Sequence, residues 1–292
     1  MSASEVRGRT IELWVEQRDG RPAVNPVMRA LLDSLLADGA HISVRVPEQR
    51  VATPSTILGD QAPDLILLKT ATTLGLSLAV AGERMGGHFL NSAHASMRAN
   101  DKPAVVARLA AAGLPVPETW MVTSSDSMTA PVATPTGWVS KPARGIHGAG
   151  VELHDRFPTA IGAADNAVPT AGWVVDDGVR MVQTRIGRDE ADLKVYVAGD
   201  RSFAGEKVFG SDSYQQDDIS ERTLEASVEA IVRAAGEVLG LRCFGVDLRF
   251  RDNQPVIIDV NPFPGYRGFP DAAQTLRGEV ERALAQSNPA VR

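Results

Sequence analysis

The sequence predicts an α/β, or α+β, fold that includes a parallel sheet near the N-terminus, and three observations support this. Short apolar runs typical of strands alternate with a helical pattern over residues 10–90, which is the order of βαβ units. The rest of the chain pairs further strand-like runs with amphipathic stretches. A length of 292 residues is sufficient for two or three packed units.

The N-terminal elements follow from hydrophobic periodicity. Strands are expected at residues 10–17, 41–47 and 63–69, where apolar runs are rich in Ile, Leu and Val. Residues 25–40 repeat apolar side chains at helical spacing and then stop at a glycine, which predicts a helix. Residues 75–93 are expected to supply the next helix and strand, with a turn at Gly86 and Gly87.

A further helix is expected at residues 100–113. Asn100 or Asp101 can cap its N-terminus, and Pro103 suits the first helical turn. Residues 121–136 are rich in Ser, Thr and Pro and are expected to form an exposed connection.

The remaining elements are mainly strands and hairpins. The expected order is two strands around a glycine-containing loop within 137–154, a short helix and loop at 158–173, a strand at 179–186, a hairpin at 191–209 turning at Gly199 and Asp200, a helix at 219–240, a hairpin at 244–261 turning at Asp252 and Asn253, and a helix at 271–288.

Composition excludes several functional classes. The net charge of −6 gives no broad basic field for nucleic acid. Cys243 is the single cysteine, which excludes an intrachain disulfide and a cysteine-built zinc site. The N-terminus lacks the apolar core of a signal peptide, and no apolar run approaches the length of a membrane span. We therefore expect a cytoplasmic protein without a membrane partner.

Polar residues that end a buried strand indicate a metal site. Asp259 and Asn261 follow the apolar run that begins at Val256, and the predicted hairpin folds Asp247 of the preceding strand toward them. Two converging carboxylates repel each other unless a cation lies between them, and all-oxygen ligands favour Mg²⁺. The alternative is that Asp247 is a solvated strand residue and that the other two form a turn before Pro262.

A glycine-containing loop is the candidate phosphate-binding segment. Lys141 ends a predicted strand, and Gly145, Gly148 and Gly150 follow it; glycines allow backbone N–H groups to approach an anion. The pattern is not a Walker loop, because the lysine precedes the glycines. A polar surface hairpin is the alternative, and His147 either contacts phosphate or faces solvent.

Two further lysines are candidate phosphate ligands. Lys102 opens a helix, where an anion is also stabilised by the helix N-terminus. Lys207 lies on the predicted strand SFAGEKVF. Each lysine alone would be interpreted as a solvated surface residue, so their weight comes from their order along the chain.

That order resembles the ATP-grasp superfamily, in particular its carboxylate–amine ligases and the enzymes similar to ribosomal-protein glutamate ligases. The resemblance rests on Lys102, on Lys141 before its loop, and on the segments MVQTRI, DLKVYVAGDRSFAGEK, FGVDLRF and VIIDVNPFPG. It implies an N-terminal Rossmann-like pre-ATP-grasp domain at 1–95, a central lid domain at 96–185, and a C-terminal domain at 186–292 that carries the metal site. ATP would lie between the last two domains.

The resemblance also implies a role for each site residue. Lys102 and Lys141 would contact the ATP phosphates, and the loop containing Gly145, His147 and Gly148 would cover them. The adenine hinge would include Gln183, Arg185 and Ile186, and Asp189 or Glu190 would bind ribose. Lys207 would lie near the γ-phosphate, and Mg²⁺ would be held by Asp247, Asp259 and Asn261.

Three positions depart from the family pattern. Thr184 stands where the hinge often carries an acidic residue, and Lys194 lies where an arginine is typical. Asp259 replaces the glutamate of the usual Glu-x-Asn motif, and a shorter carboxylate still binds Mg²⁺. The segment DVNPFPGY is also similar to the inositol polyphosphate kinases of the same superfamily.

The function implied by the resemblance is ATP- and Mg²⁺-dependent joining of a small-molecule carboxylate to an amine through an acyl phosphate. Arg249 and Arg267 are candidates for holding the acceptor, with Tyr266 and Phe269 shaping its pocket. One alternative is a kinase for a small polyol or inositol phosphate, and another is a nucleotide-binding regulatory protein without turnover. The sequence determines neither the substrates nor the oligomeric state, so a homodimer is left open.

Overall fold

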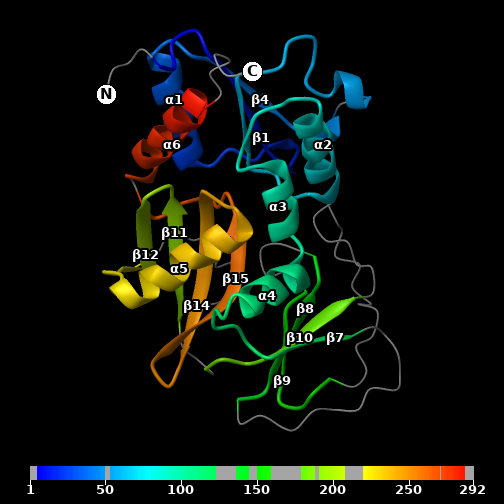
Figure 1. Cartoon of the computed structure of the whole chain (residues 1–292), viewed down its shortest axis with the longest axis vertical. Helices are drawn as coiled ribbons and strands as arrows, with labels where there is room; N and C mark the ends of the chain where they lie inside the picture. Colours follow the sequence, from blue (N-terminus) through cyan, green and yellow to red (C-terminus); the bar gives the residue numbers. More distant parts are fainter. Residues whose placement is uncertain are drawn as a thin grey trace.

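The computed structural model describes residues 5–49, 53–122, 136–144, 150–158, 179–187, 191–207, 220–269 and 271–286. In this part of the chain the strands form three larger sheets and one two-stranded ribbon. Figure 1 shows the N-terminal sheet with its helices at one end of the molecule and the other two larger sheets side by side at the other end. Residues 123–135 of the connection expected at 121–136, and residues 159–173 of the helix and loop expected at 158–173, lie outside the described residues.

The N-terminal sheet is parallel, as the βαβ pattern predicts. Its strands are β1 (Thr10–Trp14), β4 (His41–Arg45), β5 (Leu65–Leu68) and β6 (Phe89–Leu90), in the order β4-β1-β5-β6. Helix α1 (Pro26–Ala37) connects β1 to β4, and α2 (Thr73–Arg84) connects β5 to β6. Parallel neighbours require such crossovers, because a tight turn reverses the chain direction once and therefore joins antiparallel strands only.

Helix α1 shows how local sequence and long-range packing combine. The Asn25 side chain caps it by accepting a hydrogen bond from the Met28 amide (2.9 Å), and Pro26 occupies the first turn. Its buried face packs beside the C-terminal helix α6 (Ala272–Gln286), as Figure 1 shows. The N-terminal sheet and the last helix therefore share one hydrophobic core.

The central sheet is antiparallel and follows helix α4. It has the order β7-β10-β8-β9, with β7 (Thr119–Val122), β8 (Trp138–Pro142), β9 (Glu152–His154) and β10 (Arg180–Thr184). Helix α4 spans Lys102–Ala111, and the Asp101 side chain caps it by accepting from the Ala104 amide (3.1 Å). Of the two N-caps that the sequence allows, the structure uses Asp101.

The C-terminal sheet carries the two predicted hairpins. Its order is β13-β12-β11-β14-β15, with β11 (Asp192–Ala198), β12 (Arg201–Lys207), β13 (Ser220–Glu221), β14 (Cys243–Arg251) and β15 (Gln254–Pro262). The turns fall at Gly199–Asp200 and at Asp252–Asn253, as expected. Helix α5 (Ala226–Leu239) covers one face of this sheet (Figure 1) through a buried stripe that includes Val228, Val232 and Leu239.

Several short elements differ from the sequence prediction. The first strand ends at Trp14, and the ribbon β2 (Gln17–Arg18) and β3 (Arg21–Pro22) follows it. Asp19 and Gly20 turn this ribbon with φ of 47° and 75°, a backbone that Asp-Gly adopts readily. Helix α3 (Ala93–Ala99) was not predicted. Strand β7 runs to Val122 and so includes the first two residues of the connection expected at 121–136. The helix expected at 219–240 begins at Ala226, and residues 220–221 form the short strand β13 instead. Two single 3-10 turns complete the order, at Pro47–Gln49 and Pro54–Thr56.

No helix in the described part of the chain combines the length and apolar character that crossing a membrane would require.

Candidate functional site

Three charged residues lie in line across the C-terminal sheet. Lys194 of β11 is the register partner of Asp247 of β14, which in turn is the partner of Asp259 of β15. The Lys194 Nζ donates to Asp247 Oδ2 at 2.7 Å. The hairpin turn thus brings the two aspartates together as the sequence predicts, and the structure adds Lys194 as the counter-ion of Asp247.

A bulge in this hairpin connects the C-terminal sheet to the central sheet. Asp247 pairs with Asp259 while Leu248 pairs with Ile257, so Ile258 is the extra residue on β15. The Lys141 Nζ on β8 donates to the Ile258 carbonyl at 2.9 Å. The Lys141 residue is only 8% exposed, so the lysine predicted to bind phosphate lies at the junction of two sheets.

Lys102 completes the group from the start of helix α4. Its Nζ donates to Asp259 Oδ1 at 2.7 Å, and its backbone N–H donates to the Ala143 carbonyl at 3.1 Å. The Asn261 amide donates to the other oxygen, Asp259 Oδ2, at 3.3 Å. The first turn of α4, the end of β8 and the end of β15 therefore converge on one carboxylate.

The two aspartates respond differently to this environment. Burial raises the pKa of Asp247, and the neighbouring Asp259 carboxylate raises it further against the opposing effect of Lys194. Burial also acts to raise the pKa of Asp259, but the charges of Lys102 and Lys141 outweigh it and the net shift is downward. Asp259 is therefore the more firmly ionised member of the pair.

The lysines also differ from one another. Burial favours neutral Lys194, yet its ion pair with Asp247 reverses this effect and raises its pKa. Burial lowers the pKa of Lys141 to about 8; Asp259 opposes that shift, and Lys102 adds to it. Lys141 is thus a buried cation whose lowered pKa lies only slightly above neutral pH.

This lowered pKa predicts a pH dependence of nucleotide affinity. Because the folded-state pKa of about 8 lies below the ordinary value of 10.5, Lys141 carries its charge below about pH 8 and loses it above. We expect the Kd of a non-hydrolysable ATP analogue to rise by up to about tenfold per pH unit above pH 8. Isothermal titration calorimetry between about pH 7 and about pH 10 measures this dependence.

The matched control for the pH dependence is Lys141→Met, in which the rise above pH 8 should disappear. An affinity of the unmutated protein that stays constant through this range would show that Lys141 does not contact phosphate.

The oxygen donors fit a magnesium ion. Carboxylate and amide oxygens are hard ligands, and Mg²⁺ in nucleotide sites is typically held by one or two carboxylates together with water and phosphate. Asp247 uses Oδ2 for Lys194, and Asp259 uses Oδ1 for Lys102 and Oδ2 for the Asn261 amide; each carboxylate oxygen has a further lone pair that can bind an ion. No three side chains from His, Cys, Asp and Glu cluster in the described ranges. The arrangement therefore fits an ion shared with phosphate rather than an all-protein cage.

The predicted adenine hinge runs out of β10. Gln183 is 3% exposed, and its side-chain amide donates to Thr119 Oγ1 at 3.0 Å. The Arg185 N–H donates to the Gly137 carbonyl at 3.0 Å, and Ile186 is buried. The segment is fixed between β7 and β8, while its contact with a base stays a prediction.

Arg249 joins the hinge segment to the C-terminal sheet. Its Nε donates to Asp192 Oδ1 at 2.6 Å, and its Nη1 donates to the Ile186 carbonyl at 3.2 Å. The guanidinium thus has a carboxylate partner within the chain. Its role toward an acceptor substrate stays a prediction. Its contacts with Asp192 and with the Ile186 carbonyl position the hinge segment against the C-terminal sheet.

The turn after β15 places Arg267 between the N-terminal and C-terminal sheets. The Gly265 carbonyl in this turn accepts a hydrogen bond from the Asn25 side chain at 3.0 Å. Arg267 interacts electrostatically with Lys69 and with Tyr196. Arg267 is therefore the predicted acceptor-binding residue that lies nearest to the N-terminal sheet.

Two neighbours of Arg267 have a different role from the one the sequence predicts. Tyr266 is 0% exposed and Phe269 is 3% exposed, and both belong to the hydrophobic core. The Tyr266 hydroxyl donates to the Val197 carbonyl at 2.5 Å. The expectation that their side chains shape a substrate pocket directly is therefore wrong: they hold the turn in place by packing.

Other predicted residues cannot be placed by their side chains. Gly145, His147, Gly148, Asp189 and Glu190 lie outside the described residues. Lys207 ends β12, opposite Asp192 in the register. Their predicted contacts with ATP stay predictions.

The sequence prediction missed charged residues that follow the strands of the N-terminal sheet. Glu16 follows β1, and Lys69 directly follows β5. The signal that could have found them is the one that identified Asp259, namely a charged side chain at the end of a buried apolar run.

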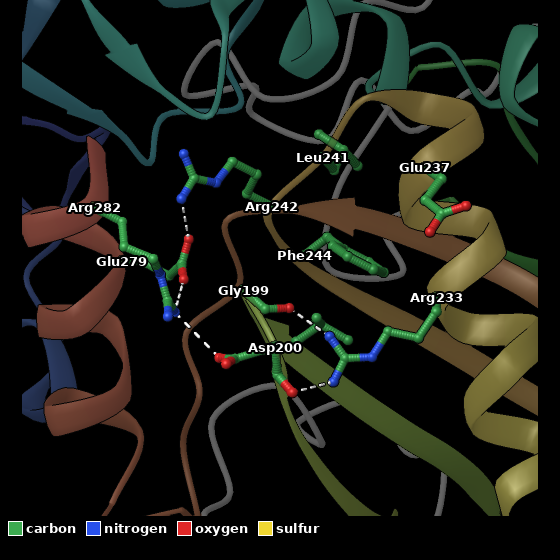
Figure 2. Close-up of a pocket in the computed structure, with 10 residues that line it drawn as sticks. Gly199, Asp200, Arg233, Glu237, Leu241, Arg242, Phe244, Glu279 and Arg282 are labelled. Carbon is green, nitrogen blue, oxygen red and sulfur yellow. Dashed lines mark hydrogen bonds and ion pairs between the residues drawn. The ribbon is translucent and has the colours of Figure 1, made fainter. Parts of the chain in front are cut away.

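A separate pocket of about 390 Å³ lies at the Gly199–Asp200 turn of the C-terminal sheet (Figure 2). Its lining residues are Val197, Gly199, Asp200, Arg233, Glu237, Leu241, Arg242, Phe244, Glu279 and Arg282. Arg242 and Arg282 both pair with the fully buried Glu279. None of the predicted site residues lines this pocket, and its ion pairs join α6 to the sheet.

The Gly199 backbone is packed against this ion network. A Cβ at Gly199 would overlap the Glu279 carboxylate, and its φ of +58° is in the left-handed region. We expect Gly199→Ala to lower the free energy of unfolding by about 2 kcal/mol more than backbone strain alone. Gly20→Ala is the control, because Gly20 has a φ of +75° and open space around it. Urea unfolding that shows equal losses would contradict the packing argument.

Comparison with known proteins supports the fold assignment. Residues 166–279 match the family described as "Inositol 1,3,4-trisphosphate 5/6-kinase ATP-grasp domain". A probable alpha-L-glutamate ligase of Legionella pneumophila is 28% identical over 208 residues, which covers 68% of this chain and 67% of that protein. A protein of the same name from Xanthomonas campestris is 28% identical over 230 residues, covering 74% and 77%.

Solved structures show the same fold over nearly the whole chain. The RimK domain protein ATP-grasp from Sphaerobacter thermophilus superposes with a TM-score of 0.70 at 17% identity, covering 94% of this chain and 99% of that one. D-alanine–D-alanine ligase from Bacillus anthracis gives a TM-score of 0.66 at 15% identity, covering 96% and 97%.

The chain therefore has the ATP-grasp fold, and residues 166–279 match an ATP-grasp domain model, which confirms the resemblance found in the sequence. The curated relatives are named as glutamate ligases and one of the solved neighbours is a D-alanine–D-alanine ligase, so the chain is similar to ATP-grasp enzymes that form C–N bonds.

Proposed function

We propose that the protein is an ATP- and Mg²⁺-dependent ligase that joins a carboxylate to an amine through an acyl phosphate. The observation that carries this proposal is the convergence of Lys102, Lys141 and Lys194 with Asp247 and Asp259 where α4, β8, β11, β14 and β15 meet. Folding alone does not require such a group, because each buried charge costs desolvation.

The proposed mechanism assigns ATP to the junction of the central segment (96–185) and the C-terminal segment (186–292). Lys102 and Lys141 would bind its phosphates, and Asp247, Asp259 and Asn261 would hold Mg²⁺. The ion, when bound, would neutralise charge on the transferring phosphoryl group. Arg249 and Lys207 would position the groups around it.

The chemistry needs little acid–base catalysis in its first step. The substrate carboxylate attacks the γ-phosphorus of ATP, which forms the acyl phosphate and releases ADP. The amine then attacks the acyl carbon, forms the C–N bond and displaces phosphate, with loss of a proton. The protein contributes mainly by positioning the reactants and stabilising negative charge.

The names of the relatives make glutamate the first candidate substrate. The division into domains at 1–95, 96–185 and 186–292, a cytoplasmic location and a homodimer are further parts of the proposal that await measurement.

A second candidate is a kinase that phosphorylates a polyol or inositol phosphate. It is favoured by the description of the family that matches residues 166–279. Such a polyanionic substrate would require a dense cluster of cations around the acceptor.

Product analysis separates the two candidates. The protein is incubated with ATP, Mg²⁺ and pools of amino acids or polyols, and the products are identified by mass spectrometry. The ligase proposal predicts an amide together with ADP and free phosphate. A phosphorylated alcohol without free phosphate would establish the kinase instead.

A further inference from the structure

Strand β4 forms an open edge of the N-terminal sheet. In the order β4-β1-β5-β6 it pairs with β1 alone within the described residues. The His41 N–H donates to the Arg9 carbonyl at 2.8 Å, so His41 bonds toward β1. Because alternate residues of a parallel strand bond to the same neighbour, Ile42 and Val44 direct their backbone N–H and C=O groups away from the sheet.

This edge lacks the features that usually keep an exposed strand from pairing. Such features are lysines, prolines and bulges, whereas β4 has the sequence HISVR and pairs with β1 regularly over all five residues. Its arginine, Arg45, is bound to Glu12 of β1 at 2.8 Å. Val44 is 41% exposed, and Ile42 is half-buried. The edge is therefore open to a further strand.

Helix α1 extends the apolar surface beside β4. The Val44 side chain lies on the α1 face of the sheet, because its register partner Leu13 packs in the core with α1. Arg277 of α6 donates to the Ser34 carbonyl of α1 at 3.5 Å. Leu36 lies on the opposite side of α1 from Ser34, since two residues turn a helix by about 200°, and Leu36 is 58% exposed. The neighbouring helix α6 thus leaves Leu36 uncovered on the β4 side.

The β4 strand is complementary to a second copy of itself in the antiparallel direction. A two-fold axis at Ser43 places Ile42 of each copy opposite Val44 of the other. These are the two residues whose backbone groups point outward, so each such pair can exchange two hydrogen bonds. Their apolar side chains meet on the α1 face of the sheet.

The exposed side of α1 suits the same two-fold axis. Arg29 and Asp33 are exposed on this helix and lie one turn apart. The axis makes the two α1 helices antiparallel, so Arg29 of each copy lies toward Asp33 of the other. Opposite charges and the apolar Leu36 would therefore face their complements across the axis.

We propose that the protein forms a homodimer in which the β4 edges of two copies pair antiparallel and join the two N-terminal sheets into one continuous sheet. The chain leaves the N-terminal sheet at its opposite edge, β6, and continues into α3 and α4. Figure 1 shows β4 at the end of the molecule away from the other two larger sheets. Pairing at β4 therefore leaves the lysines and aspartates of the candidate nucleotide site uncovered.

Light scattering coupled to size-exclusion chromatography tests the association of the full chain. We expect a particle of twice the chain mass of 31.1 kDa. Val44→Lys should raise the dimer Kd by at least about tenfold, measured by sedimentation, because it would bury an ammonium against Ile42 of the second copy. Met85→Lys is the control, because Met85 is 52% exposed and lies just after α2. A monomeric unmutated protein, or equal dissociation of both variants, overturns the proposal.

Disulfide trapping tests the register of the pair. Ser43→Cys places two thiols opposite each other on the axis, at a Cα separation that a disulfide spans. His41→Cys is the matched control, since His41 is exposed on the same strand but is separated from its own copy by four residues, or about 13 Å. The native Cys243 is buried and does not compete.

Oxidation should crosslink Ser43→Cys at least about tenfold faster than His41→Cys, because the axis holds the first pair of thiols at high effective concentration. Equal rates would indicate random collision and overturn the β4 pairing, even where Val44→Lys fails to fold. Neither experiment reads ADP formation or product, so failure of the ligase proposal leaves both results unchanged.

Discussion

Replacing Asp259 with asparagine is expected to reduce kcat/KM for ATP-dependent ADP formation by about 100-fold or more. Asp259 accepts from Lys102 and Asn261, and it lies opposite Asp247 across the hairpin. Its pKa is lowered because Lys102 and Lys141 outweigh the effect of burial. Asparagine keeps the shape and removes the negative charge that the cations and the proposed metal ion require.

Asp252→Asn is the matched control for this experiment. Asp252 is exposed in the turn of the same hairpin with a φ of 51°, a conformation that asparagine tolerates well. Steady-state release of ADP should be unchanged in this control, and circular dichroism should show that both variants are folded. Full activity in Asp259→Asn would remove Asp259 from the site.

Lys141→Met is expected to lower kcat/KM for ATP by about 100-fold, mainly through a higher KM. Lys141 is a nearly buried cation at the junction of β8 and β15, and its hydrogen bond to the Ile258 carbonyl fixes its direction. Methionine fills a similar volume without charge. The proposed phosphate contact is lost while the packing is largely kept.

The same substitution should change stability little. Because the folded-state pKa of Lys141, about 8, lies below the ordinary 10.5, the buried charge costs free energy at pH 7, and this cost disappears as pH rises through the interval between the two values. Removing the charge offsets the lost hydrogen bond, so the free energy of unfolding should stay within about 1 kcal/mol of the unmutated value.

Arg156→Met, at an exposed position after β9, is the control for loss of a cation. It should keep the unmutated KM for ATP. A Lys141→Met protein that is folded and binds ATP normally would contradict the assignment of Lys141, whereas one that unfolds would show that the charge is needed for packing.

The hairpin that carries the two aspartates was predictable because its signals are local. Asp252 and Asn253 suit the turn, and counting outward from it brings Asp247 opposite Ile258, next to Asp259; the bulge then makes Asp259 its register partner. The bulge at Ile258 was not predictable, since it depends on how β15 fits both β14 and the Lys141 ammonium of another sheet. The carbonyl that orients Lys141 could therefore not be identified from the sequence.

Long-range register and packing limited the remaining predictions. Lys194 meets Asp247 only because β11 lies beside β14 in the antiparallel sheet, and neither strand's own sequence determines which strand becomes its neighbour. Tyr266 follows a proline- and glycine-containing turn that is typical of a surface loop, yet the turn folds back against the N-terminal sheet and its ring is buried. Local sequence cannot distinguish a surface turn from one that the opposite end of the chain covers.

The central claim is that Asp247, Asp259 and Asn261 hold a divalent ion beside the phosphates of ATP. An anomalous difference map from a crystal grown with Mn²⁺ and a non-hydrolysable ATP analogue tests it most directly. The account predicts a single strong peak within about 2.5 Å of oxygens from both aspartates, with the nucleotide phosphates on its other side. A peak at another group of residues, with the analogue bound away from Lys141, would contradict it.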